Sequence, residues 1–381
     1  MKIVLAIDSF KGSLSSLDAA RAAQEGIKEA IPDAVTECFS VADGGEGTSE
    51  ALAQSFGADK ETVCVTGPLG EKVFADYCFD KKTSTAIMEM SKAAGLPLVP
   101  MEKRNPLKTT TYGVGEMIAD ALSKGCRNFI VGIGGSATND GGVGMLKALG
   151  FEFFDSDGNQ IDKCAQGLEK LSKISCQNAL PALSECHFEI ACDVTNPLCG
   201  ENGCSAVFAP QKGADPDTVL KMDAWLANYA RLSKTVCPNA DPELSGTGAA
   251  GGMGFAFVTY LGAELKKGIE LVIEKTGIET AIENCDIVVT GEGRIDAQTA
   301  MGKAPAGIAK TAKKHGKPVV AFCGTASDDS DLCNLFGIDG IFPVLRKPCL
   351  LSEAMAHDVA YNNMKNTAKQ VFSLINAIKK Q

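Results

Sequence analysis

The hydrophobic residues of this chain come in short runs, and four of these runs end at glycine-rich segments. The apolar runs cover residues 4–7, 39–41, 129–131 and 287–289, and the segments that follow them cover residues 8–12, 42–48, 132–140 and 290–296. Short, nearly continuous apolar runs are typical of buried parallel strands. In open α/β sheets the ligand binds outside the carboxyl ends of such strands. The pattern therefore predicts a ligand site built from loops at strand ends.

Between the first two runs the pattern changes to a helical period. Leu17, Ala20, Ile27 and other apolar residues up to position 31 share one face of a helix. Ser15 followed by Asp18 has the spacing of a capping box, and Pro32 ends the helix. The first sixty residues are thus predicted to form alternating strands and helices.

After residue 60 the pattern favours antiparallel strands. Residues 62–65 and 73–79 flank the turn at 67–70, and residues 85–90 form a third strand. Alternation then returns, with helices predicted at 112–122 and 141–149 and strands at 129–133, 188–191, 287–289, 319–322 and 340–344. A final helix reaches residue 378. Antiparallel strands after a βαβ unit indicate a second lobe.

We therefore predict an α/β fold in two parts. Residues 1–60 and 286–381 form a discontinuous Rossmann-like, flavodoxin-like parallel-sheet domain, and residues 61–285 form an inserted mixed α/β lobe. The length of 381 residues agrees with two domains. The active site is expected in a cleft between the two parts.

Composition excludes several classes of protein. The net charge of −10 and the lack of a basic run argue against a nucleic-acid partner. The odd number of cysteines, 15, without a C-x-x-C pair predicts free, mostly buried thiols in a reducing compartment. Asp8 interrupts the first apolar run, so no signal peptide is expected. Residues 244–263 are uncharged but rich in glycine, which predicts a loop and a buried helix, with no membrane span. We expect a cytoplasmic location.

Two cations in the strand-end segments are candidates for binding an anion. Lys11 lies between a strand end and a helix start, where the helix dipole favours negative charge. Arg294 lies in the segment Gly291-Glu292-Gly293-Arg294-Ile295-Asp296 and can hold a carboxylate or a phosphoryl group with two parallel hydrogen bonds. The simpler alternatives are a solvated lysine and an Arg294 salt bridge to Glu292 or Asp296.

Four aspartates are predicted at the same sheet edge: Asp8, Asp43, Asp193 and Asp296. A single aspartate at a strand end is more often a cap or turn residue than a catalyst. Four together can supply a general base and a Mg²⁺ ligand. The residues do not decide which aspartate has which role.

Residues 132–137 fit G-x-G-x-x-A, which is a weak dinucleotide-binding pattern by itself. No acidic residue closes a clear parallel strand after it, so NAD is the weaker alternative. The Walker A pattern and G-x-S-x-G are absent, and no glycine-rich segment contains a histidine. Together these features favour phosphoryl transfer to a small substrate.

The chain resembles the bacterial glycerate kinases over nearly its whole length. The resemblance rests on seven motifs in one order, at residues 8–12, 42–48, 66–70, 132–142, 193–198, 246–252 and 291–296. It implies that ATP phosphorylates D-glycerate, more commonly at the 2-hydroxyl, with Mg²⁺ as a helper and a place in glyoxylate and sugar-acid metabolism. The alternatives are an NAD-dependent hydroxy-acid dehydrogenase and a non-catalytic binding protein for a sugar acid or nucleotide.

The expected site follows from these motifs. The catalytic candidates are Lys11, Asp43, Asp193, Arg294 and Asp296, with Asp193 also the candidate metal ligand. Candidate binding residues are Asp8, Ser9, Gly44, Gly45, Gly47, Thr109, Thr110, Gly134, Gly135, Ser136, Asn139, Asp140, Asn196, Gly291 and Glu292. The expected partner is the small substrate alone, without nucleic acid or membrane, in a monomer or homodimer.

Overall fold

The computed structural model describes residues 1–42, 48–300 and 302–380. Contacts within the chain group it into two compact units. Unit 1 contains Met1–Asp43, Glu50–Ser55 and Gly268–Gln381, and unit 2 contains Gly44–Ser49 and Phe56–Lys267. The sequence-based division at residues 60/61 and 285/286, with an active site between the parts, stays a prediction.

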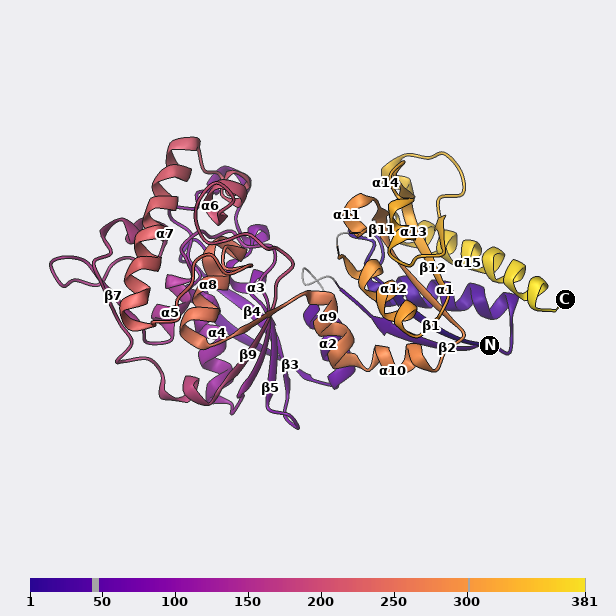
Figure 1. Cartoon of the computed structure of the whole chain (residues 1–381), viewed down its shortest axis with the longest axis horizontal. Helices are drawn as coiled ribbons and strands as arrows, with labels where there is room; N and C mark the ends of the chain where they lie inside the picture. Colours follow the sequence, from indigo (N-terminus) through magenta and orange to yellow (C-terminus); the bar gives the residue numbers. More distant parts are fainter. Residues whose placement is uncertain (43–47, 301, 381) are drawn as a thin grey trace. The chain divides into compact units, whose positions relative to one another are not determined.

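Unit 1 is built on a five-stranded parallel sheet (Figure 1). Its strands are β1 (Lys2–Ile7), β2 (Val35–Ser40), β11 (Ile287–Ile295), β12 (Val319–Ala326) and β13 (Gly340–Pro343). Their spatial order is β13-β12-β11-β1-β2, and every neighbouring pair is parallel. Counted along this unit the order is 2-1-3-4-5, the flavodoxin-like arrangement. The predicted parallel-sheet fold is therefore confirmed, and the order reverses between β1 and β11.

Helices surround this sheet. On one face α1 (Ser16–Ala30) and α15 (His357–Lys379) pack together, and their apolar residues form a core with Leu5, Val289 and Phe322 of the strands. The helix α12 (Ala304–Lys314) contacts β1, β11 and β12, and also packs against α9 (Gly268–Thr276) and α10 (Ile278–Glu283). Short helices α11 (Ala297–Ala300), α13 (Leu332–Leu335) and α14 (Leu351–Ala354) complete the unit, and α2 (Thr48–Phe56) contributes residues to both units.

The start of α1 shows the predicted cap. Ser15 Oγ accepts a hydrogen bond from the Asp18 backbone N–H at 3.1 Å, and the Ser15 hydroxyl donates to Asp18 Oδ2 at 2.7 Å. Asp18 also places a negative charge in the first turn, where the helix dipole favours it. The helix ends at Ala30, and its C-cap Ile31 directly precedes Pro32. Local sequence signals therefore fix both ends of α1.

Unit 2 contains a six-stranded mixed sheet in the order β10-β9-β6-β5-β4-β3. The strands are β3 (Asp59–Thr66), β4 (Lys72–Asp80), β5 (Thr85–Glu89), β6 (Asn128–Gly132), β9 (His187–Ala191) and β10 (Glu264–Lys266). The β3–β4 and β4–β5 pairs are antiparallel, and the other pairs are parallel. The predicted hairpin and third strand are therefore confirmed.

The helices of unit 2 are α3 (Ser91–Ala94), α4 (Tyr112–Ser123), α5 (Val143–Ala148), α6 (Cys204–Phe208), α7 (Pro216–Val236) and α8 (Ala249–Leu261), beside a small hairpin of β7 (Glu152–Phe154) and β8 (Lys173–Ser175). The predicted loop and buried helix within residues 244–263 correspond to α8 and the turn before it. Over the described part of the chain, no helix has the length and apolar character needed to span a membrane.

Two expectations from the sequence were wrong in detail. The strand predicted at residues 287–289 continues through Ile295, so the segment with Arg294 is part of β11 and is no loop. It keeps pairing with β12 because glycine permits close backbone approach: a Cβ on Gly291 would lie 1.9 Å from the Phe322 carbonyl oxygen. The 15 cysteines are all free, as predicted, but only five of them are fully buried.

Candidate active site

A cavity in unit 1 lies where the strand order reverses. It has a volume of about 520 Å³ and opens at the carboxyl ends of β1 and β11. The switch point of a doubly wound sheet is where such folds bind ligands. Six residues predicted from the sequence line this cavity, namely Asp8, Ser9, Lys11, Glu292, Arg294 and Asp296. Gly291, directly before Glu292, allows the backbones of β11 and β12 to pair closely.

The lining of this cavity has a polar and an apolar part. The apolar part includes Phe10 from the turn after β1, Val344 and Leu345 after β13, and Leu351 and Met355 around α14. Leu351 and Leu345 keep much of their surface exposed to solvent. A cavity of this kind suits a ligand with one charged end and one apolar, planar or aliphatic end.

The charges in the cavity are arranged around two carboxylates. Arg294 Nε lies 3.5 Å from Asp296 Oδ2, so the salt-bridge alternative is present in the structure. Lys303 Nζ lies 3.6 Å from Glu292 Oε2 and 3.9 Å from Asp296 Oδ1. Thr299 Oγ1 also donates a hydrogen bond to Glu292 Oε1 at 2.6 Å. The side chain of Arg294 is nevertheless 69% exposed, which leaves its guanidinium available to a ligand.

Lys303 was missed in the sequence. It is the N-cap residue of α12, which begins at Ala304 and carries Pro305 in its first turn. The sequence signal that could have indicated Lys303 is a glycine and a lysine directly before the Ala-Pro pair that begins the helix. Its ammonium lies near the same two carboxylates as the Arg294 segment, so it belongs to the same cluster of charges.

Lys11 is presented by a tight turn after β1. The backbone N–H of Phe10 donates to the Leu14 carbonyl at 2.9 Å, and the Ser13 N–H donates to the Phe10 carbonyl at 2.7 Å. Gly12 closes the turn at a φ of 75°, which glycine adopts without strain. Lys11 is exposed at the tip, while Asp8 is buried and accepts a hydrogen bond from the Ser9 N–H at 2.6 Å. The turn therefore presents an exposed cation, and the strand end before it holds a buried carboxylate.

Unit 2 carries a second group of predicted residues, in the loop after β6. Gly134 and Gly135 are exposed, and the residues that follow them in the loop are buried. The Gly135 carbonyl accepts from the Leu96 N–H, and the Ala137 N–H donates to the Ala94 carbonyl, both at 2.9 Å. Gly135 has a φ of 71°. The loop therefore presents bare backbone at its exposed tip.

Asp140 is an anchor beneath this loop. Its carboxylate is fully buried and accepts hydrogen bonds from the Thr111 N–H and Thr111 hydroxyl, both at 2.8 Å, and from the N–H groups of Gly142 at 3.2 Å and Gly144 at 3.3 Å. Burial raises the pKa of this carboxyl group, and these hydrogen bonds oppose the rise. Its carboxylate is thus turned to the protein, and its geometry is that of a positioning residue.

Three other predicted binding residues have the same character. Thr109 Oγ1 donates to the Ala137 carbonyl at 2.9 Å, and Thr110 Oγ1 donates to the Lys163 carbonyl. Asn139 Nδ2 donates to Ser205 Oγ at 2.9 Å. All three are buried. These hydrogen bonds fix the shape of the loop, and the binding role expected of the three residues stays a prediction.

The parallel strands of unit 2 bring more polar residues to the same sheet edge. Glu89, Gly132 and Ala191 are neighbours in register at the ends of β5, β6 and β9. Two residues beyond Ala191 lies Asp193, which is exposed, and Asn196 Nδ2 donates to the Asn202 carbonyl at 2.8 Å.

Glu89 was not among the sequence candidates. It is buried, and its Oε1 accepts from the Ser49 N–H at 3.2 Å and the Ser49 hydroxyl at 2.9 Å. An acid at the end of an otherwise apolar strand was the signal for it. Asp43, Gly44, Gly45 and Gly47 lie outside the described residues.

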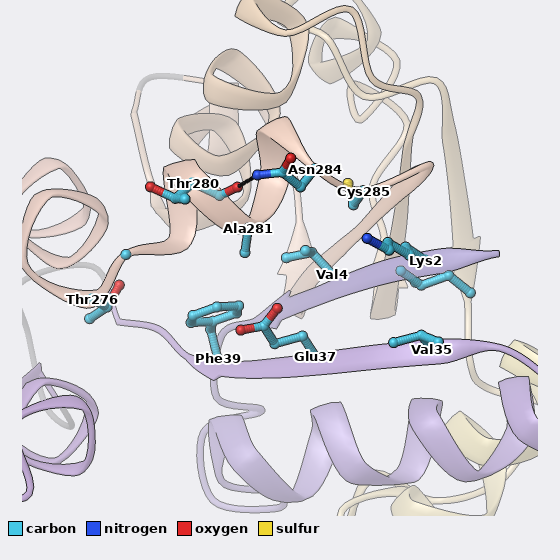
Figure 2. A pocket seen from close by; sticks show the side chains of 12 residues that line it. Lys2, Val4, Val35, Glu37, Phe39, Thr276, Thr280, Ala281, Asn284 and Cys285 are labelled. Carbon is cyan, nitrogen blue, oxygen red and sulfur yellow. Dashed lines mark hydrogen bonds between the residues drawn. The ribbon is translucent and has the colours of Figure 1, made fainter.

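A further cavity of unit 1, of about 610 Å³, contains none of the predicted site residues. It lies beside β1, β2 and α10, with Lys2, Glu37 and Phe39 on one side and Thr280 and Asn284 on the other (Figure 2). The Asn284 amide donates to the Thr280 carbonyl of its own helix at 2.8 Å. Because this cavity is away from the sheet's carboxyl edge, it is no candidate for the active site.

One group of three possible metal ligands occurs among the described residues. His187, Glu189 and Glu264 have ligand atoms within 4.8 Å of one another. Lys266 Nζ, however, lies 2.6 Å from Glu189 Oε1 and already compensates its charge. His187 lies at the start of β9, the end opposite to the glycine-rich loop. This group is therefore not the predicted magnesium site.

Lysine, arginine and carboxylates around the switch point of a doubly wound sheet define a protein that binds a charged small molecule. Comparison with known proteins is more specific. The model of the Glycerate kinase family matches residues 3–376, so the chain belongs to the glycerate kinase family.

Individual relatives agree with this assignment. Over 371 residues the chain is 46% identical to the glycerate 2-kinase of Escherichia coli K12, with 97% of each protein covered. It is 43% identical over 379 residues to the glycerate kinase of Bacillus subtilis 168, covering 100% of this chain and 99% of the relative. The crystal structure of the candidate glycerate kinase 2 from Salmonella typhimurium LT2 superposes with a TM-score of 0.91 at 44% identity, with full coverage of both chains.

Proposed function

We propose that this protein transfers the γ-phosphoryl group of ATP to the 2-hydroxyl of D-glycerate and releases ADP. Membership of the glycerate kinase family carries the proposal. The relative named glycerate 2-kinase supports the 2-position. The cavity at the switch point of unit 1, whose lining includes Lys11, Arg294 and Lys303, is suited to phosphate oxygens.

The two-sided lining of the unit 1 cavity supports a nucleotide as its ligand. The apolar side chains around Phe10 and Leu351 offer a surface for a purine base, and Lys11 and Arg294 offer charges for the phosphates. In phosphoryl transfer the protein acts mainly by positioning and by neutralising developing charge. We assign that role to Lys11 and Arg294, with Asp296 fixing Arg294 through their ion pair or contacting the substrate hydroxyl.

We propose that the loop at Gly134 and Gly135 binds anionic oxygens through its backbone N–H groups. Its support is the exposure of both glycines above a buried base that hydrogen bonds to Asp140 hold in place. Ser136, Asn139 and Asp140 hold the loop, and Asp193 and Asn196 follow the neighbouring strand β9.

We propose that Mg²⁺ binds together with the phosphates of ATP. Mg²⁺ prefers oxygen ligands and usually takes only one or two carboxylates, with phosphates and water completing its shell. The exposed carboxylate of Asp193 fits this requirement. When bound, the ion would withdraw negative charge from the phosphate oxygens. A cytoplasmic location, a role in glyoxylate and sugar-acid metabolism, and a monomer or homodimer stay predictions.

The dehydrogenase alternative finds no support in the strand order. A dinucleotide-binding loop is expected at the first βα turn and at a switch point. The G-x-G-x-x-A loop follows β6. In the sheet of unit 2 the strands lie side by side in the same order as along the chain, β3-β4-β5-β6-β9-β10, so this sheet has no switch point. NAD is therefore not expected on this loop.

The proposal is tested by ADP release from MgATP over D-glycerate, L-glycerate, lactate, glycolate and tartronate. We expect turnover to depend on D-glycerate and to be lost without Mg²⁺. Nuclear magnetic resonance of the product should place the phosphate on the 2-oxygen. ADP release that is independent of the acid, or reduction of NAD by a hydroxy acid, would contradict the proposal.

A further inference from the structure

Lys212 is a charged side chain in the interior of unit 2. It ends the short 3₁₀ helix η5 (Pro210–Lys212) and is only 2% exposed. Lysine is almost never fully buried unless it has a charged partner. The burial of this side chain therefore needs an explanation.

The ammonium of Lys212 is bonded to the glycine-rich loop after β6. Nζ donates to Ser136 Oγ at 2.8 Å and to the Thr138 carbonyl at 2.6 Å. Ser136 directly follows the exposed pair Gly134 and Gly135. Lys212 thus lies beneath the loop and holds it from the buried side.

Within the described part of the chain, Lys212 forms no ion pair with a carboxylate. Asp140 acts on it only at longer range, because the contacts of that carboxylate are with Thr111, Gly142 and Gly144. The backbone of Arg104 lies beside the residue after Lys212: a Cβ on Gly213 would be 2.3 Å from the Arg104 carbonyl oxygen, and Arg104 Nε is buried without a hydrogen-bond partner among the described residues. A buried cation without a counter-ion is unfavourable unless an anion joins it.

We propose that Lys212 is the positioning residue of the 134–138 loop and that its buried charge is balanced when this loop binds an anionic oxygen of a substrate. The inference rests on the proposed anion-binding role of Gly134 and Gly135. The anion is a carboxylate of glycerate or a phosphate of ATP, which share the same chemistry. Ser136 and the Thr138 carbonyl transmit the effect of Lys212 to the loop.

The protonation of Lys212 gives this role a measurable signature. Burial lowers the pKa of Lys212 to about 8, and Cys204 and Asp140 are the titratable groups that oppose the shift. Cys204 is itself a buried thiol whose pKa burial raises to about 12, so it stays neutral in this range. An anion on the loop favours the protonated ammonium and raises its pKa. Binding near pH 8.5 should therefore take up protons, and affinity should fall as the pH rises above about 8.

The test compares Lys212→Met, Lys212→Arg and wild type, with separate titrations of ATP and D-glycerate between pH 7 and 9.5. For wild type we expect proton uptake with one ligand, seen as a binding heat that depends on the ionisation heat of the buffer. Lys212→Met should bind that ligand about tenfold more weakly, without dependence on pH. Lys212→Arg keeps a charge that does not titrate, so it should recover affinity and lose the pH dependence.

Lys234→Met, at an exposed position of α7, is the matched control and should match wild type. If Lys212→Met does not fold, the Ser136→Ala variant and the proton uptake of the wild type test the proposal in its place. Wild-type enzyme that turns over glycerate but takes up no protons with either ligand would overturn the inference and leave the proposed function intact. A Lys212→Met variant with the affinity and pH dependence of wild type would also overturn the inference and leave the proposed function intact. Lack of glycerate-dependent turnover in wild type would instead contradict the proposed function.

Discussion

Lys11 and Arg294 differ from the other charged residues of the unit 1 cavity in their exposure. Asp8 and Glu292 are buried and bonded to the protein, whereas both cations face solvent. An exposed ion pair such as Arg294–Asp296 contributes little to stability. The two cations are therefore free to serve a ligand, and substitutions there should change kinetics more than folding.

Lys11→Ala should lower kcat for glycerate phosphorylation about a hundredfold while the melting temperature stays close to that of wild type. Loss of one preorganised charge contact to a transferring group costs about 3 kcal/mol. Lys28→Ala, at an exposed lysine of α1, is the control and should leave kcat unchanged. Near-normal kcat/KM in a folded Lys11→Ala variant would remove Lys11 from the site.

Arg294→Lys should recover only part of the activity that Arg294→Ala loses. An ammonium cannot make the planar, two-pronged contact of a guanidinium. Steady-state kinetics with ATP and D-glycerate varied separately would show which ligand Arg294 contacts. Wild-type kcat and KM in Arg294→Lys would exclude the bidentate role, and wild-type values in Arg294→Ala would leave only the salt bridge to Asp296.

For single residues, the sequence predicted which loops carry polar side chains. It was less informative about the role of each side chain. Strand ends bring Asp8, Lys11 and Glu292 to one cavity, because parallel strands share a carboxyl edge. Asn139 and Asp140, by contrast, are buried and bonded to the protein, and no local pattern distinguishes a loop anchor from a ligand contact. Lys212 could not be found, since its burial depends on tertiary packing with residues about 75 positions away.

Among the elements, α1 illustrates how local signals and close packing combine. Its cap at Ser15 and its end before Pro32 follow from short sequence patterns. Its pairing with α15 depends on Gly26, where a Cβ would lie 2.0 Å from the Lys365 carbonyl oxygen. Glycine is unfavourable in a helix by about 1 kcal/mol, so its presence here is explained by the close approach of the two backbones.

Gly26→Ala should lower the free energy of unfolding by about 1–3 kcal/mol, because overpacking outweighs the better helix propensity of alanine. Denaturant unfolding measures this difference. Arg21→Ala, on the exposed side of the same helix, should stay within about 0.5 kcal/mol of wild type. A Gly26→Ala protein as stable as wild type would mean that α1 and α15 can separate at no cost.

The strand β11 shows where element prediction failed. Glycines and charges at residues 290–296 have the composition of a loop, yet the segment pairs with β12 as far as Ile295 and Ala326. Gly291 permits the approach to Phe322, and Gly324 permits a matching approach to Gly293. Composition could not reveal this, because the partner strand lies some thirty residues further along the chain.

For the molecule as a whole, alternation of strands and helices was enough to predict a parallel α/β sheet with an inserted mixed sheet. The strand order itself required the structure. It places the switch point at β1 and β11, which explains why Lys11 and Arg294 line one cavity although they are 283 residues apart. Family membership then gives this arrangement its chemistry.

The most direct test of the account is the position of the phosphate in the product. Purified enzyme is incubated with MgATP and D-glycerate, and ADP formation and phosphorus resonances are followed together. We predict one ADP for each phosphorylated glycerate, with the phosphate on the 2-oxygen. Phosphate on the 3-oxygen would contradict the proposed transfer to the 2-hydroxyl, and ADP formation without any phosphoglycerate would contradict the proposed kinase activity itself.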